Sequence, residues 1–170
     1  MNKNLLSCIY LSLIIILLQA CVTVKVASNK DESYTKQPKK IFVLMNAAKQ
    51  SKEFTRVFLM ELQSKLKEKG VETETYERDP LSLETEKDIT SKINNYAPDA
   101  LMVIAQKEVH STNNMVDGGS FEISLTDGES KKVVWKSELG VVGPYALGQT
   151  ASKGLDELMK KLVEDKIVRP

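Results

Sequence analysis

The sequence is poor in the residues that build disulfide frameworks and zinc sites. Its 170 residues include two cysteines, Cys8 and Cys21, and one histidine, His110. We expect the segment containing Cys8 to be removed, so the mature chain would keep one cysteine and form no internal disulfide. A zinc site needs about four cysteine or histidine ligands. A calcium or magnesium site built of oxygen ligands stays open, although no acidic stretch has the spacing of a calcium loop. We expect no metal and no cofactor.

The chain also lacks an apolar run long enough to span a bilayer. The run at residues 5–18 has 14 residues, whereas a membrane-spanning helix needs about 20. One cation, Lys3, precedes the run, and the small residue Ala20 follows it, which is the order of a signal peptide. No second apolar run follows. We therefore expect residues 1–20 to be removed as a signal peptide.

The tetrapeptide LQAC at residues 18–21 resembles the lipobox of bacterial lipoproteins. The resemblance implies cleavage before Cys21, a thioether lipid on its sulfur and acylation of the new amino group. Each buried methylene contributes about 0.8 kcal/mol, and two or more chains hold firmly where one does not. Two alternatives stay open: an ordinary secretory signal in which Cys21 has no role, and an uncleaved anchor.

Neither sign of charge prevails. The chain has 24 basic and 23 acidic residues, and loss of Lys3 with the signal peptide would leave 23 of each. A nucleic-acid binder needs a basic face that releases counterions. The basic cluster around Lys36 and Lys39 is offset by Asp31 and Glu32. We expect no nucleic-acid partner.

Motifs typical of enzymes are absent. The sequence contains no Gly-x-Ser-x-Gly elbow, and DGGS at residues 117–120 lacks the lysine and spacing of a phosphate loop. His110 and Ser111 are adjacent, but a catalytic base must face its nucleophile. We interpret residues 110–119 as a polar loop and expect no catalytic residue and no enzyme activity. Three carboxylates surround a helix start, where the helix dipole favours negative charge: Glu84, Glu86 and Asp88.

The rest of the chain divides into a polar segment and one domain. Residues 21–40 are rich in Lys, Ser, Asp and Glu, so we interpret them as the lipidated cysteine and a polar tether. The alternation of Val22, Val24 and Val26 leaves a short strand open as the alternative. Residues 41–170 have the length of a single domain.

Hydrophobic periodicity in residues 41–170 predicts an α/β (α+β) fold in the order β-α-β-α-β-β-β-α. Helix-joined strands favour parallel pairing and the closing hairpin favours antiparallel pairing, so we expect one mixed sheet with helices packed mainly on one face. Trp135 alternates in phase with Val133, which favours core packing. The expected strands are 41–45, 71–76, 100–105, 121–125 and 133–139, and the expected helices are 54–66, 85–96 and 150–163.

Together with the lipobox, the segments APDALMVI, FEISLTDGES and KVVWKSEL give the chain the pattern of small envelope lipoproteins of Gram-negative bacteria. It resembles those that carry the TolB amino-terminal domain or the CsgG-like domain. The resemblance implies a lipid-anchored, non-catalytic interaction or adaptor module for envelope assembly or transport, with another envelope protein as its partner. It also implies a place in the cell envelope, on the outer membrane facing the periplasm.

One loop stands out for its apolar content. Residues 140–149, GVVGPYALGQ, carry four apolar side chains among glycines and a proline, and apolar residues in loops either fold onto the core or meet a partner. Thr150 begins the last helix, whose amino terminus could hold an anion. A small-ligand (anion) binding lipoprotein is therefore the alternative function. The expected partner-contact residues are Val141, Val142, Tyr145 and Leu147.

Overall fold

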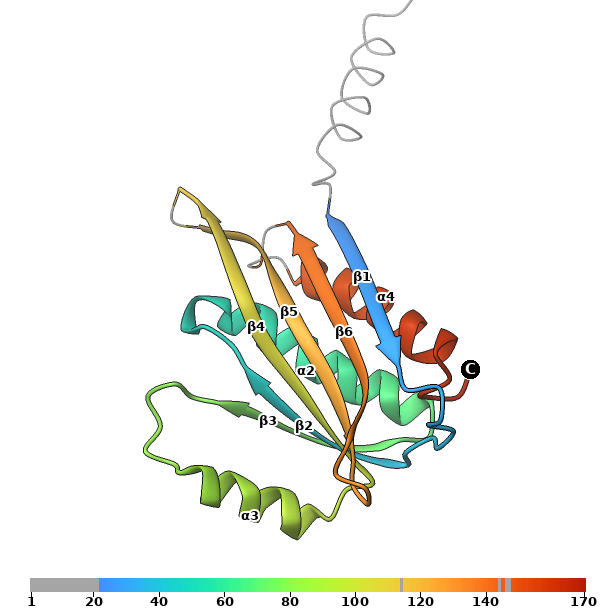
Figure 1. Cartoon of the computed structure of the whole chain (residues 1–170). Coiled ribbons are helices and arrows are strands. Elements are labelled where there is room, and N and C mark those ends of the chain that lie inside the picture. The colour runs from blue at the N-terminus through green and yellow to red at the C-terminus, as the bar shows by residue number, and fades with distance from the viewer. Residues whose placement is uncertain (1–21, 114, 144, 146–147) are drawn as a thin grey trace, which may run out of the picture.

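In the part of the chain that the structure describes, six strands pair into one mixed sheet in the order β1-β6-β5-β4-β2-β3, with three α-helices packed against it (Figure 1). The structure is a computed structural model that describes residues 22–113, 115–143, 145 and 148–170. The expected class is confirmed, although a strand, β1, precedes the expected order. The strands are β1 Thr23–Lys30, β2 Lys40–Asn46, β3 Glu72–Arg78, β4 Ala100–Thr112, β5 Met115–Asp127 and β6 Val133–Val142; the helices are η1 Lys49–Ser51, α2 Lys52–Glu68, α3 Glu86–Tyr96 and α4 Gln149–Glu164.

The first half of the fold is a parallel α/β unit. Strand β2 pairs in parallel with β3 on one side and with β4 on the other. Helix α2 connects β2 to β3, and α3 connects β3 to β4. Gly70 ends the α2 connection with a φ of 75°, a left-handed angle that suits glycine. The second half is antiparallel, since β5 pairs with β4, β6 with β5, and β1 with β6.

Helices α2 and α4 cover one face of the sheet and enclose the main core (Figure 1). Phe54 and Phe58 of α2 and Leu155 of α4 pack there against alternate residues of the strands. Trp135 is buried in this core, as expected, and its indole nitrogen donates to Asp165 Oδ2 at 2.8 Å. Within the part of the chain that the structure describes, no helix is long and apolar enough to cross a membrane.

Helix α3 packs on the other face of the sheet. Phe42 of β2 alternates with core residues and so points away from α2 and α4. Its ring meets that of Tyr96 in α3 edge to face, with centroids 5.9 Å apart. Helices α2 and α4 thus share a face, while α3 lies against the opposite one.

Residues 23–30 do not form a tether. They form the edge strand β1, whose Val24 and Val26 pack against the core while alternate side chains face solvent. The Ser28 hydroxyl and the Lys30 ammonium bind Asp165 at the end of α4. The tether prediction was wrong because a strand with one solvated face has the polar composition of a linker. The open alternative, a short strand, is what the structure contains.

The prediction of a polar loop at residues 110–119 was also wrong. Strands β4 and β5 continue past the core as a long hairpin, paired up to Thr112 and Met115. The ladder shifts register between Gln106 and Glu108 and again between His110 and Ser111. Backbone pairing between neighbouring strands holds the hairpin together without an apolar core, so its polar side chains gave the appearance of a loop.

Candidate functional site

One end of the sheet gathers the features that bear most directly on function. Thr23 of β1 lies opposite Val142 of β6, Val142 lies opposite Gly118 of β5, and Gly118 lies opposite His110 of β4. The β4–β5 hairpin continues beyond this row of residues. Cys21 precedes Thr23 by two positions. We call this the anchor end: the row from Thr23 to His110 together with the hairpin beyond it (Figure 1).

The anchor end exposes apolar side chains. Val109 is 36% exposed, Met115 is 69% exposed and Val142 is 57% exposed. Residues 111–116 carry no charged side chain. The tip of the hairpin is therefore polar and uncharged, and Met115 adds an exposed apolar side chain to it.

The loop that was expected to contact a partner is divided between core and surface. Val141 is buried because β6 runs on to Val142 and its alternation turns Val141 toward the helices. Tyr145 is also buried, with its ring stacked 4.4 Å from that of Phe54. These two residues are therefore not a contact surface, and that prediction was wrong for them. Val142 is exposed, and Leu147 lies outside the described residues.

Burial also alters the environment of the Tyr145 hydroxyl. The oxygen has no hydrogen-bond partner among the described residues, and burial raises the pKa of Tyr145. A Cβ added to Gly119 would lie 2.9 Å from this oxygen, so the glycine makes room for the ring.

Thr150 does not form the expected anion site. Helix α4 begins at Gln149 with Gly148 as its N-cap, two positions before the expected cap, Thr150. The Thr150 side chain is buried and faces Gly143, whose added Cβ would lie 2.8 Å from the Thr150 hydroxyl. A buried hydroxyl is not open to an incoming anion.

The residues considered for catalysis are exposed on the surface, paired with oppositely charged side chains or part of a helix cap. His110 is exposed on β4, 3.6 Å from a Glu108 carboxylate oxygen and not oriented by a buried acid. Thr85 and Asp88 form a capping box at the start of α3. Glu86 binds Arg78 at 2.6 Å, and Glu84 binds Lys92 at 3.1 Å. The dipole and capping interpretation of Asp88 therefore agrees with the structure.

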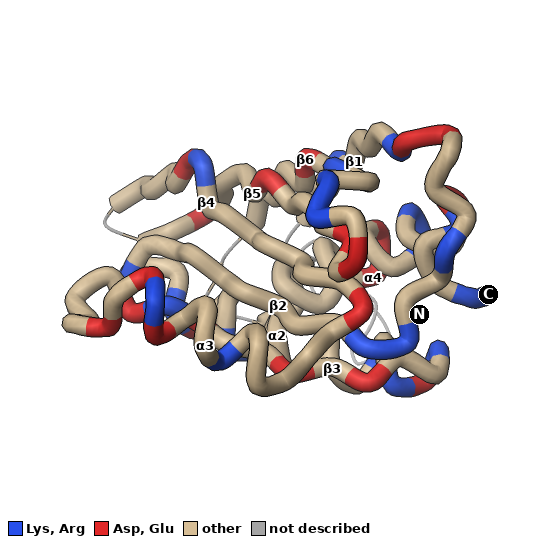
Figure 2. The backbone as a smooth tube through the Cα atoms, turned by 60° about the horizontal axis from the view of Figure 1, so that its bottom comes forward, with Lys and Arg blue, Asp and Glu red and all other residues tan. Residues whose placement is uncertain are grey.

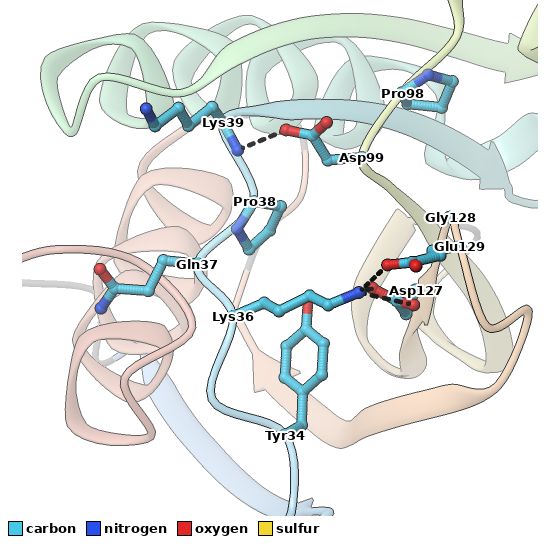
Figure 3. A pocket seen from close by; sticks show the side chains of 10 residues that line it. All are labelled: Tyr34, Lys36, Gln37, Pro38, Lys39, Pro98, Asp99, Asp127, Gly128 and Glu129. Carbon is cyan, nitrogen blue, oxygen red and sulfur yellow. Dashed lines mark hydrogen bonds and ion pairs between the residues drawn. The ribbon is translucent and has the colours of Figure 1, made fainter.

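A groove of about 590 Å³ lies at the opposite end of the sheet (Figure 3). Its polar groups bind one another: the Lys36 ammonium lies 3.2 Å from Asp127 and 2.6 Å from Glu129. The pKa of Asp127 is lowered to about 2, mainly by hydrogen bonds from Ser130 and to a smaller extent by the Lys36 ammonium. The lining residues are Tyr34, Lys36, Gln37, Pro38, Lys39, Pro98, Asp99, Asp127, Gly128 and Glu129.

Asp99 makes the remaining polar contacts of this groove. Its Oδ2 accepts the backbone N–H of Lys39 at 2.8 Å and of Lys40 at 3.0 Å, and its carbonyl accepts the N–H of Gly128 at 2.7 Å. The carboxylates therefore tie the start of β2 and the β5–β6 turn together. We assign the groove a structural role.

A smaller pocket of about 270 Å³ lies at the carboxyl ends of β2 and β3. The chain leaves these two strands toward opposite faces, a place where α/β sheets commonly bind ligands. Lys49 and Lys52 line it, whereas Glu77 accepts the Thr55 hydroxyl and Arg78 is paired with Glu86.

The described residues show neither a metal centre nor a surface of one sign. Among them, no group of three or more His, Cys, Asp and Glu side chains is placed to hold a metal ion. Figure 2 shows Lys and Arg interspersed with Asp and Glu along the backbone. The charges are thus arranged as a mixed, solvated surface.

Comparisons with known proteins bear on the fold. No protein-family model matches the sequence, and no curated protein matches it. The structure is similar to a PelC dodecamer from Paraburkholderia phytofirmans, with a TM-score of 0.55 and 12% identity over 87% of this chain and 100% of that chain. A point variant of that dodecamer matches with a TM-score of 0.55 and 12% identity, over 85% of this chain and 99% of that chain. A protein described as a neuraminyllactose-binding hemagglutinin homologue from Helicobacter pylori matches with a TM-score of 0.40 and 10% identity, over 81% of this chain and 89% of that chain. At 12% identity, the PelC likeness shows a shared fold.

The anchor end was missed at the level of sequence. Val109 and Met115 stand in a polar stretch, and apolar residues there were the signal that could have been noticed. Their exposure depends on how far the hairpin extends past the core, which local sequence patterns do not report.

Proposed function

We propose that the protein is a non-catalytic, lipid-anchored subunit of an envelope assembly, held by Cys21 on the outer membrane and facing the periplasm. One observation carries the proposal: β1 begins at Thr23, two positions after the lipobox cysteine. A lipid on Cys21 would hold the sheet directly at the bilayer, with no tether between them. The resemblance to the TolB and CsgG-like domains stays a prediction.

The open edge of β1 supports assembly with other subunits. Within the described chain, β1 pairs with β6 on one side and with no strand on the other. An unpaired strand edge presents backbone groups that can pair with another chain. The likeness to PelC adds a protein of similar fold that is described as a dodecamer. We propose that this protein also works as an oligomer.

Anchoring is tested by labelling with a fatty acid in a Gram-negative host. The wild-type chain should incorporate the label and fractionate with the outer membrane, and Cys21→Ala should do neither. Cys8→Ala is the matched control, because Cys8 lies in the segment to be removed. Label that persists in Cys21→Ala would contradict lipidation at this residue.

Assembly is tested by light scattering in detergent and by one change at the edge strand. Asp31 N–H donates to Val134 O at 2.9 Å, so in an antiparallel ladder the alternate amide of Val26 points to the open edge. Val26→Pro removes that outward N–H, whereas Val26→Thr keeps it. We expect an oligomer from the wild type and Val26→Thr and a smaller species from Val26→Pro. A wild-type monomer would contradict the assembly.

Small-anion binding is the second candidate function, now at the pocket between β2 and β3 and not at Thr150. Lys49 and Lys52 line this pocket and make no ion pair within the described chain. Phosphate at 100 times its dissociation constant should then stabilise the fold by about 2.7 kcal/mol, which raises the melting temperature. Lys49→Gln with Lys52→Gln should abolish the shift, while Lys67→Gln on α2 should not.

A further inference from the structure

We propose that the anchor end of the sheet is a second membrane contact, in which the β4–β5 hairpin enters the lipid headgroup region. The proposal rests on the proposed lipidation of Cys21 and adds a protein surface to that anchor. Its ligand is the phospholipid surface itself.

The strand register places the hairpin at the level of the anchor. Thr23 and Gly118 both lie opposite Val142 and so share one row of the sheet. Met115 lies opposite Thr112, which stands two residues beyond His110, the partner of Gly118, or about 7 Å along the strand at a rise of about 3.4 Å per residue. Cys21 stands two residues beyond Thr23 and can reach no more than about 7 Å further. The paired end of the hairpin therefore extends at least as far along the sheet as Cys21 can reach.

The surface chemistry of the hairpin suits the headgroup region. Residues 111–116 are hydroxyl, amide and apolar side chains without charge. Met115 and Val109 expose apolar surface, and Val142 adds more at the row of Thr23. The β4–β5 ladder pairs the backbone groups that face each other across the hairpin, while β4 has no second neighbouring strand beyond Ala105 in the described chain. The hydrated headgroup region, unlike the hydrocarbon core, can satisfy those outer groups. An uncharged tip with exposed apolar side chains can thus meet the headgroups without the desolvation of a charged side chain.

The position of the chain outside the structure selects lipid as the occupant. The described chain starts at Val22, at this end of β1, and the lipobox cysteine is the preceding residue. Only one residue separates Cys21 from the edge of the sheet, so the acyl chains cannot move far from it. A surface held this close to the bilayer meets headgroups before it meets another protein.

The experiment reads the depth of single fluorescent probes on lipidated protein. Mature protein has no free thiol once Cys21 is lipidated, so Met115→Cys, Val142→Cys and Met60→Cys can each carry one environment-sensitive nitrobenzoxadiazole label. Met60 is the matched control, an exposed methionine on α2 at 58% exposure. The proteins are added to phosphatidylethanolamine–phosphatidylglycerol vesicles with and without spin labels on the headgroups, and circular dichroism checks their folding.

We expect a blue shift and strong quenching at Met115, weaker quenching at Val142 and none at Met60. Equal quenching at Met115 and Met60 overturns the inference. A blue-shifted Met115 probe that the spin labels do not quench also overturns it, because a second copy or a partner protein then covers the hairpin. Mass spectrometry of the same sample separates the two proposals: absence of lipid on Cys21 overturns both, whereas lipid without quenching overturns the membrane contact alone.

Discussion

At the scale of single residues, burial decides what Tyr145 contributes. Its ring stacks on Phe54, and its hydroxyl has no hydrogen-bond partner among the described residues. An unpaired buried hydroxyl reduces stability, while the ring increases it. Tyr145 therefore stabilises the core through its ring, while its hydroxyl oxygen adds no hydrogen bond among the described residues.

This environment predicts a contrast between two substitutions. Tyr145→Ala should lower the free energy of unfolding by about 3 to 5 kcal/mol, because it empties a core position. Tyr145→Phe should leave it within about 1 kcal/mol of the wild type, since it removes only the unpaired hydroxyl. Urea unfolding measures both values. A large loss in Tyr145→Phe would mean that the hydroxyl has a partner after all.

Asp127 predicts how stability responds to acid. Hydrogen bonds from Ser130 and the Lys36 ammonium hold its pKa at about 2 in the folded protein, against 3.8 for the ordinary carboxyl group. Because the folded pKa is the lower one, the carboxylate stabilises the fold above about pH 4, and this contribution is lost as the pH falls through about 2.

The measurement is unfolding free energy between pH 6 and pH 2. Asp127→Asn should be less stable than the wild type at pH 6 and should approach it at pH 2, where about half of the wild-type carboxyl is protonated and most of its contribution is lost. Glu129→Gln is the control, since this exposed residue also binds Lys36. A difference between Asp127→Asn and the wild type that is independent of pH would contradict the assigned pKa.

At the scale of elements, β1 belongs to the folded domain. Strand β1 covers the edge of β6, and the segment after it buries Tyr34 in the core. A chain that begins at Lys39 should therefore lose about 3 kcal/mol of stability or more, from lost apolar burial and backbone pairing. It should also aggregate through the exposed edge of β6.

A chain that begins at Val22 is the matched comparison, because it keeps β1 and lacks only residues outside the described range. Thermal unfolding and sedimentation compare the two. Equal melting temperatures would show that residues 22–38 contribute nothing to the fold.

At the scale of the whole molecule, chain order suggests the order of folding. β2, β3 and β4 are close in the sequence, whereas Thr23 of β1 must find Val142 across most of the chain. Contacts between distant segments cost more loop-closure entropy and tend to form late. We expect β1 to dock after the rest of the sheet.

Two valine substitutions on the same core face test this order. Val26→Ala in β1 should mainly accelerate unfolding, by about fivefold for each kcal/mol lost, and should leave the folding rate nearly unchanged. Val43→Ala in β2 should slow folding as well. Stopped-flow unfolding and refolding measure both rates. Slower folding in Val26→Ala would place β1 in the early structure.

The sequence by itself determined the elements whose signal lies within a short window. The apolar run that became β2, the helical stripe of α2 and the alternation of β6 each repeat over a few residues, so their class follows from local periodicity. The α/β class with a mixed sheet followed from their succession.

The tertiary structure alone decided which residues are covered. Val24 and Val26 became part of a sheet because β6 offers an edge to pair with, and Tyr145 became core because Phe54 lies across from it. Met115 became exposed because its hairpin extends beyond the helices. Burial depends on neighbours that are distant along the chain, and a local pattern contains no information about them.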